Sequence, residues 1–309
     1  MNVEQANSQA LDFLCKGDFD SAQKFFYLNA KQNPCCQTYN NLGSFLYDNG
    51  MTLKNGKNVS AVAYAKRYVK KAFEYDHSSA IVSQNLGRMY YEENDYTNAY
   101  HCFSLAYVND HNEKILFNKA ISLFPLHRYL EAYECFQMIK PLFPEAVFPY
   151  LLTMAICDEE NFFRFQKTNE YHELIQQMNL LDQMIFFYFR NQYQKILEIE
   201  SELNKTWSLR ESDWAILVDA LIQLGQEDTI RPIIEEKLSN YDSFHEKSLY
   251  QSVTMLLNEG STRKEVIREH FNTLSFPQII LCNYFGCEDH HTPWETKNQG
   301  TVSVKTILR

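Results

Sequence analysis

The chain is poor in the two residues that most often interrupt helices, with only 9 Gly and 8 Pro among its 309 residues. This composition argues against a many-stranded β fold, which needs both residues in its turns, and it suits long helices. Positive charge is also scarce, because 29 Lys and Arg face 39 Asp and Glu, for a formal net charge of −10. Since an acidic surface repels a phosphate backbone, we expect no nucleic-acid partner.

Signals of membrane insertion and secretion are missing as well. The most apolar short stretch, residues 184–189, is too short to cross a bilayer, so we expect no membrane insertion. Residues 1–5 have neither the basic start nor the apolar run of a secretory signal. The eight cysteines lack the regular spacing of a disulfide framework. Together these features predict a soluble, cytoplasmic protein.

The chain also lacks the usual catalytic signatures: a glycine-rich phosphate loop, His-Glu-x-x-His and Gly-x-Ser-x-Gly. We therefore predict that it is not an enzyme and that it binds no cofactor. The closest approach to a metal site is the group Cys282, Cys287, His290 and His291, whose side chains suit zinc. Its spacing matches no familiar closed site, and adjacent histidines rarely reach one ion. We expect an apolar Cys282 and surface histidines there, with a zinc site as the alternative.

Aromatic residues, in contrast, are abundant at 15% of the chain. Small, aromatic and turn residues recur at the same offsets in four stretches, about 34 residues apart once one insertion is allowed. In chain order the copies are Ala10, Phe13, Gly17, Phe19, Ala22, Phe26 and Pro34; Leu42, Gly43, Leu46, Ala65, Val69 and Ala72; Leu86, Gly87, Tyr90, Tyr96, Ala99, Phe103 and Ala106; and Tyr129, Ala132, Phe136 and Pro144.

This pattern resembles the tetratricopeptide repeat (TPR), a helix–turn–helix unit. The resemblance implies an all-α fold, a right-handed superhelical α-solenoid of stacked TPR-like hairpins. Gly87 and Ala99 would lie where two antiparallel helices cross, since only small side chains permit a close approach there. Tyr90, Tyr96 and Phe103 would fill the space beside that crossing.

We predict three parts of the chain. Residues 1–146 form four TPR-like repeats, with an insertion loop at 48–58 that carries two Asn-Gly steps. Residues 147–275 form divergent TPR-like hairpins of the same solenoid, in which the small residues are missing or displaced. Residues 276–309 form a C-terminal helix end and an irregular tail. One open alternative places the tail from Thr301 to Arg309 in the groove as an internal ligand.

In TPR arrays the first helix of each pair lines a concave groove, so the resemblance implies a groove that takes a peptide. Asn41, Asn85 and Lys119 share one repeat position there, two residues before the glycine site, and Arg88 and Asn118 lie close by. An amide can both donate to and accept from a peptide backbone, so such a ladder would hold an extended segment whatever its sequence. Arg88 and Lys119 would favour an acidic side chain or a terminal carboxylate.

The function predicted from these observations is that of a non-catalytic adaptor or scaffold whose partner is another protein or a peptide segment. Three alternatives stay open. One is a regulatory peptide sensor, because bacterial peptide-pheromone receptors also hold peptides on Asn-bearing inner helices. Another is a scaffold that self-associates through aromatic stretches such as 162–163 and 185–189. The third is an enzyme or metal protein that uses the C-terminal Cys/His group. The oligomeric state is left open.

Overall fold

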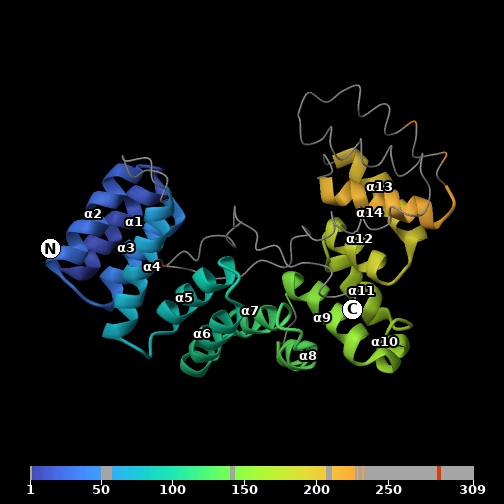
Figure 1. The fold of residues 1–309 in the computed structure, drawn as a ribbon, viewed down its shortest axis with the longest axis horizontal. Coiled ribbons are helices and arrows are strands. Elements are labelled where there is room, and N and C mark those ends of the chain that lie inside the picture. The colour runs from blue at the N-terminus through green and yellow to red at the C-terminus, as the bar shows by residue number, and fades with distance from the viewer. Residues whose placement is uncertain are drawn as a thin grey trace. The chain divides into compact units, whose positions relative to one another are not determined.

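The computed structural model describes residues 2–49, 58–139, 143–206, 211–226 and 284–286, together with Asp228 and Pro232. Regular secondary structure within these residues is helical, without a strand, which confirms the predicted all-α class (Figure 1). The chain divides into two compact units, one of Met1–Lys140 with Gln278–Gly300 and the other of Pro141–Pro277 with Thr301–Arg309. Among the helices described, none combines the length and apolar character needed to span a bilayer.

In the first unit, consecutive helices pack in pairs, as Figure 1 shows: α1 with α2, α3 with α4, α5 with α6, and α7 with α8. All four pairs fall within residues 1–146, the part predicted to form four TPR-like repeats. Their bounds are α1 Val3–Cys15, α2 Phe19–Gln32, α3 Cys36–Asn49, α4 Asn58–Tyr75, α5 Ala80–Glu92, α6 Tyr96–Asn109, α7 Glu113–Leu123 and α8 Tyr129–Met138.

The turn that ends the first helix of a pair has a recurring backbone geometry. At the first turn the amide of Asp18 donates to the carbonyl of Phe13 and that of Gly17 to Leu14. This Schellman arrangement, with a positive φ at its centre, satisfies carbonyls that the helix end leaves free. The Asp18 carboxylate then caps α2 by accepting from the Ser21 amide. The same pair of backbone bonds recurs around Asn94, His127, Asn191 and Gly225, all of positive φ.

Two glycines at the repeated position allow paired helices to touch. A Cβ on Gly43 would lie 2.6 Å from Val69 Cγ2 and 3.0 Å from the carbonyl oxygen of Ala65. A Cβ on Gly87 would lie 2.7 Å from Cε1 of Phe103. The predicted role of Gly87, to permit a close approach of the paired helix, is thus confirmed. The group that packs against Gly87 is the ring of Phe103.

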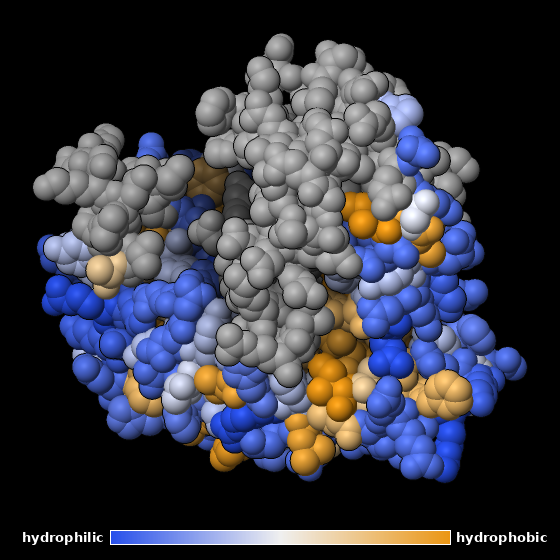
Figure 2. Space-filling view, turned by 45° about the vertical axis from the view of Figure 1, so that its right-hand side comes forward, coloured by the Kyte–Doolittle hydropathy of each residue, from blue (hydrophilic) through white to orange (hydrophobic). Residues whose placement is uncertain are grey.

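The core of the first unit is continuous from α1 to α5, and it includes one residue from far along the chain. Phe26 and Phe45 lie at its centre, with ring centroids 5.4 Å apart, and both are buried. Tyr284 belongs to the same cluster and is only 6% exposed. Outside the core, Figure 2 shows a mostly hydrophilic face on which hydrophobic residues gather in separate groups.

The second unit consists of shorter and less regular helices. Within it α9 packs against α10, α11 and α12, and α13 packs against α12 and α14. Of the aromatic stretches considered for self-association, Phe162, Ile185, Phe186 and Phe187 are buried, whereas Phe163 is exposed. The bounds are α9 Pro144–Cys157, α10 Glu159–Phe165, α11 Asn169–Gln177, α12 Leu180–Phe189, α13 Tyr193–Thr206 and α14 Glu211–Gln223.

The described helices reach into both ends of the predicted loop at 48–58. Helix α3 continues through Asn49, and α4 already begins at Asn58, so only 50–57 lie outside the described residues. The physical reason at the first end is that Asp48 pairs with Arg88 of the next repeat, which favours an ordered last turn. The tail from Thr301 to Arg309 also lies outside the described residues, so its proposed place in the groove stays a prediction.

Candidate functional site

Helices α3 and α5 each carry a polar stripe along one face. On α3 the stripe consists of Asn41, Ser44 and Asp48, whose spacing of three and seven residues places them on the same side of a helix. On α5 the residues at the equivalent positions are Asn85, Arg88 and Glu92. The repeat therefore brings two short rows of amide, hydroxyl and charged groups next to each other between the second and third hairpins.

Asn41 binds the main chain of a residue from the distant C-terminal part of the same unit. Its Nδ2 donates to the carbonyl oxygen of Phe285 at 3.0 Å, and its Oδ1 accepts from the Phe285 amide at 2.8 Å. The side chain is fully buried, so these two bonds are protected from water. An amide that both donates to and accepts from one residue's backbone is the arrangement predicted for Asn41, here with a segment of its own chain.

Two further asparagines, Asn40 and Asn85, form hydrogen bonds next to Asn41. Asn85 donates to Asn40 Oδ1 at 2.7 Å and to Ser44 Oγ at 3.1 Å. Asn40 in turn donates to Asn41 Oδ1 at 3.3 Å. Asn85 is 2% exposed, so the bonds that it makes tie α5 to α3. The structure places Asn85 against Asn40 and Ser44, and its predicted part in ligand binding stays a prediction.

Tyr284, the residue before Phe285, is buried in the core of the first unit. Its ring stacks on Phe26 with centroids 5.9 Å apart and planes at 21°. Its hydroxyl donates to Asp48 Oδ2 at 3.0 Å. Tyr284 thus offers an apolar ring to an apolar surface and its one donor to a buried carboxylate, which is the usual requirement for burying a tyrosine.

Arg88 pairs with Asp48, whose carboxylate accepts from the Tyr284 hydroxyl. Its Nη1 donates to Asp48 Oδ1 at 2.9 Å, and its Nε donates to Glu92 Oε1 at 2.8 Å. Burial alone would lower the pKa of Arg88, but the two carboxylates raise it above its ordinary value, so the guanidinium stays charged. Tyr47 completes the cluster by donating to Glu92 Oε2 at 2.5 Å, and burial together with Glu92 raises the pKa of this phenol.

The other two predicted groove residues belong to α7. Asn118 is fully buried, and Lys119 is half-buried with its Nζ 5.9 Å from the ring centroids of both Tyr100 and Tyr107 on α6. Lys119 thus lies over aromatic rings of the preceding hairpin, and the geometry supports the ladder most clearly at Asn41. Whether Asn118 and Lys119 take part in binding stays a prediction.

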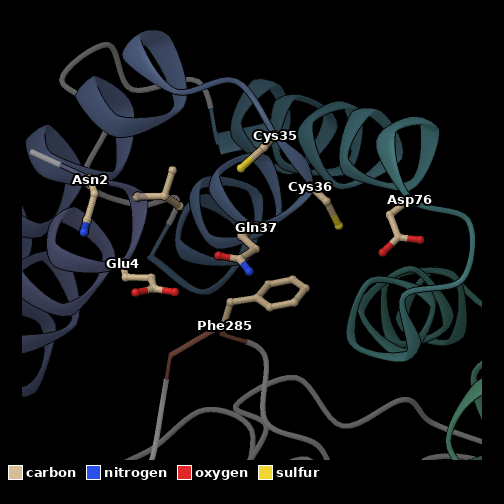
Figure 3. Close-up of a pocket in the computed structure, with 8 residues that line it drawn as sticks. Asn2, Glu4, Cys35, Cys36, Gln37, Asp76 and Phe285 are labelled. Atoms are coloured by element: carbon tan, nitrogen blue, oxygen red, sulfur yellow. The ribbon is translucent and has the colours of Figure 1, made fainter.

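A hollow of about 620 Å³ opens next to the Asn41 site. Figure 3 shows the ring of Phe285 beside Gln37, with Asn2 and Glu4 on one side and Asp76 on the other. Cys36 also lines the hollow, and burial raises the pKa of its thiol to about 11, so the thiol is protonated at neutral pH. The hollow offers space and polar edges to a side chain at the Phe285 position.

No group of three or more His, Cys, Asp or Glu suited to a metal ion is found in the described part of the chain. The predicted zinc alternative concerned Cys282, Cys287, His290 and His291, which lie outside the described residues. The zinc alternative therefore stays a prediction.

Sequence reasoning missed two members of the site. The predicted loop at 48–58 includes Asp48, although this residue lies seven residues after Asn41 and matches Glu92 in the next repeat, a spacing that indicates a shared helix face. Tyr284 falls in the predicted C-terminal part at 276–309, and in the sequence only the Tyr-Phe-Gly run itself draws attention to it.

No protein-family model matches the chain, and no curated protein matches its sequence. Solved structures do match it in fold. A tetratricopeptide repeat protein from Parabacteroides merdae has a TM-score of 0.56 at 13% identity, covering 82% of this chain and 98% of that chain. Pseudomonas aeruginosa pilF has a TM-score of 0.48 at 14% identity, covering 81% and 96%. The first of these likenesses confirms the predicted TPR-like helical repeat fold, and it concerns the fold alone.

Proposed function

Starting from a TPR-like helical repeat fold, we propose that this chain is a non-catalytic adaptor or scaffold that binds a peptide segment of a partner protein. The binding site is the groove lined by the first helices of the repeats, with Asn41 as its central residue. One observation carries the proposal, namely the pair of hydrogen bonds between the Asn41 side chain and the backbone of Phe285. A backbone contact of this kind gives affinity that does not depend on the ligand's side chains.

The surrounding groups support a binding role more than a catalytic one. Arg88 is already engaged by Asp48 and Glu92, and its raised pKa keeps it a fixed positive charge. The phenol of Tyr47 is likewise held protonated, because burial raises its pKa. Groups with these properties orient and recognise a ligand, whereas general acid–base catalysis needs a group that titrates near the working pH. The proposal includes a cytoplasmic location, which rests on the cysteine pattern of the sequence.

The test is affinity selection from a random peptide library on purified full-length protein. It uses the Tyr284→Ala background, so that Asn41 is not already engaged by Phe285. Peptides enriched on this protein should be lost when Asn41→Ala is added. They should be retained with Asn109→Ala, which changes an exposed asparagine of α6 in the same unit. Equal enrichment with and without Asn41→Ala would contradict the proposed function.

A further inference from the structure

Tyr284, Phe285 and Gly286 are each held at the Asn41 site in a different way. Tyr284 is recognised by its ring and hydroxyl, and Phe285 by its backbone. Gly286 is recognised by its conformation, with a φ of 82° that L side chains rarely adopt. Three successive residues thus meet three separate requirements, as a bound peptide does.

We infer that the Asn41 site selects segments with the chemistry Tyr-aromatic-Gly and that residues 284–286 are its resident ligand, which a partner segment of this chemistry displaces. This inference rests on the proposed function and adds the ligand class and its regulation. A chain that exchanges its own segment for a partner's would act as a peptide sensor.

Selectivity for tyrosine follows from the Asp48 carboxylate. Its side chain is 1% exposed, one oxygen pairs with Arg88, and the other accepts from the Tyr284 hydroxyl. A phenylalanine would withdraw that donor from a buried carboxylate, and a site built around a hydroxyl rejects ligands that lack it. A phosphorylated tyrosine would place a second negative group against Asp48 and would be repelled.

The next two positions are constrained differently. The Phe285 side chain is half-buried beside the hollow of about 620 Å³, so an aromatic of another shape fits there. Only its amide and carbonyl are held by Asn41. After it the chain must turn with a positive φ, and a Cβ on Gly286 would lie 3.9 Å from Leu11 Cδ1, so glycine is preferred for its backbone and not for lack of space.

Displacement requires that the resident segment leaves without unfolding the repeats. It adds one buried tyrosine to a core that α1 to α5 already share, and Gly286 is exposed. Because it is covalently attached, its effective concentration at the site is high, and a free peptide must compete with it. Removing the resident tyrosine should therefore increase the affinity for an external peptide.

The experiment measures fluorescence anisotropy of a labelled peptide with the sequence of residues 281–289, in which Cys282 and Cys287 are replaced by serine. The peptide should bind the full-length Tyr284→Ala protein at least about tenfold more tightly than wild type, because the competing segment has been weakened. Equal affinity for both proteins, or binding to neither, would overturn the inference.

Two modified peptides test the contacts without altering the protein fold. Tyr284→Phe in the peptide and N-methylation of its Phe285 amide should each weaken binding to the Tyr284→Ala protein by about tenfold. In a protein that also carries Asn41→Ala, N-methylation of the peptide should no longer change the affinity, because the side chain that accepts from the Phe285 amide is absent. Circular dichroism checks that each protein variant is folded.

These outcomes separate the inference from the function on which it rests. If the Tyr284→Phe peptide binds as well as the original, tyrosine selectivity is wrong, while Asn41-dependent peptide binding stands. If Asn41→Ala leaves the affinity of every peptide unchanged, the proposed function itself is wrong. A tyrosine-phosphorylated peptide that binds as tightly as the original would also overturn the role given to Asp48.

Discussion

Arg88 on α5 forms an ion pair with Asp48 on α3, with 2.9 Å between Nη1 and Oδ1 and side chains that are 10% and 1% exposed. The pair joins the second and third hairpins of the first unit. It also fixes the carboxylate that accepts the Tyr284 hydroxyl. One buried contact therefore connects the packing of the repeats to the geometry of the candidate site.

Replacing Arg88 should destabilise the first unit. In Arg88→Met the Asp48 carboxylate loses its buried counter-charge, and we expect the free energy of unfolding to fall by about 3 kcal/mol. The control is Arg128→Met, because Arg128 pairs with Glu131 through side chains that are 38% and 46% exposed and should matter much less. Urea denaturation followed by circular dichroism measures both variants. Equal losses would contradict the importance of the buried pair.

Gly43→Ala should destabilise the protein although alanine is the better helix former. The added Cβ would meet Val69 Cγ2 and also the backbone of Ala65 and Val69, so no side-chain rotation relieves all of the contacts. We expect a net loss of about 1–2 kcal/mol, after about 1 kcal/mol gained in helix propensity offsets part of the overpacking cost. Gly87→Ala should cost less, since its Cβ meets only the Phe103 ring among the nearest atoms. An unchanged or higher melting temperature for Gly43→Ala would contradict this account.

The repeat pattern made much of the first unit predictable, because its residues act through local sterics. Gly43 and Gly87 admit a neighbouring helix, and turns such as Gly17-Asp18 end one helix and cap the next. These effects depend on residues within one repeat, which the sequence displays several times. Asp48 at the end of α3 is held by Arg88 forty residues away, a contact that only a comparison of Asp48 with Glu92 in the next repeat would indicate.

Alkylation of Cys102 should depend on pH in a defined window. Burial raises the pKa of its thiol from 9.0 to about 11. Since the folded state favours the neutral thiol, it gains stability below pH 9 that is lost as the pH rises towards 11. The rate of reaction with iodoacetamide, followed by mass spectrometry, should rise up to about pH 11 in native protein and level off near pH 9 in urea. A native rate that levels off near pH 9 would contradict the burial of this thiol.

Asn85→Ala should weaken peptide binding indirectly. Asn85 donates to Asn40, and Asn40 donates to Asn41, so the substitution loosens the amide that holds the ligand backbone. We expect a loss of about threefold in affinity, against about tenfold for Asn41→Ala, which removes both ligand bonds. Anisotropy with the 281–289 peptide on the Tyr284→Ala background gives both values. A loss of stability in Asn85→Ala without any loss of affinity would contradict the positioning role.

The candidate site was predictable only in part. Asn41 is a candidate from the sequence because an amide at a repeated inner position suits the binding of a peptide backbone, and its contact with a partner stays a prediction. Asn85 shares that repeat position, but its contacts with Asn40 and Ser44 arise from the packing of two hairpins and are not visible in a single repeat. Tyr284 lies 236 residues beyond Asp48, and a contact over that distance depends on the folded chain.

The central claim is that Asn41 holds the backbone of a ligand segment, and the most direct test is hydrogen exchange of the Phe285 amide. Selective ¹⁵N-phenylalanine labelling allows this amide to be followed by NMR in wild type, Asn41→Ala and Asn109→Ala. We predict slow exchange in wild type and Asn109→Ala and fast exchange in Asn41→Ala, because the amide donates to Asn41 Oδ1. Fast exchange in wild type, or protection that survives Asn41→Ala, would contradict the account.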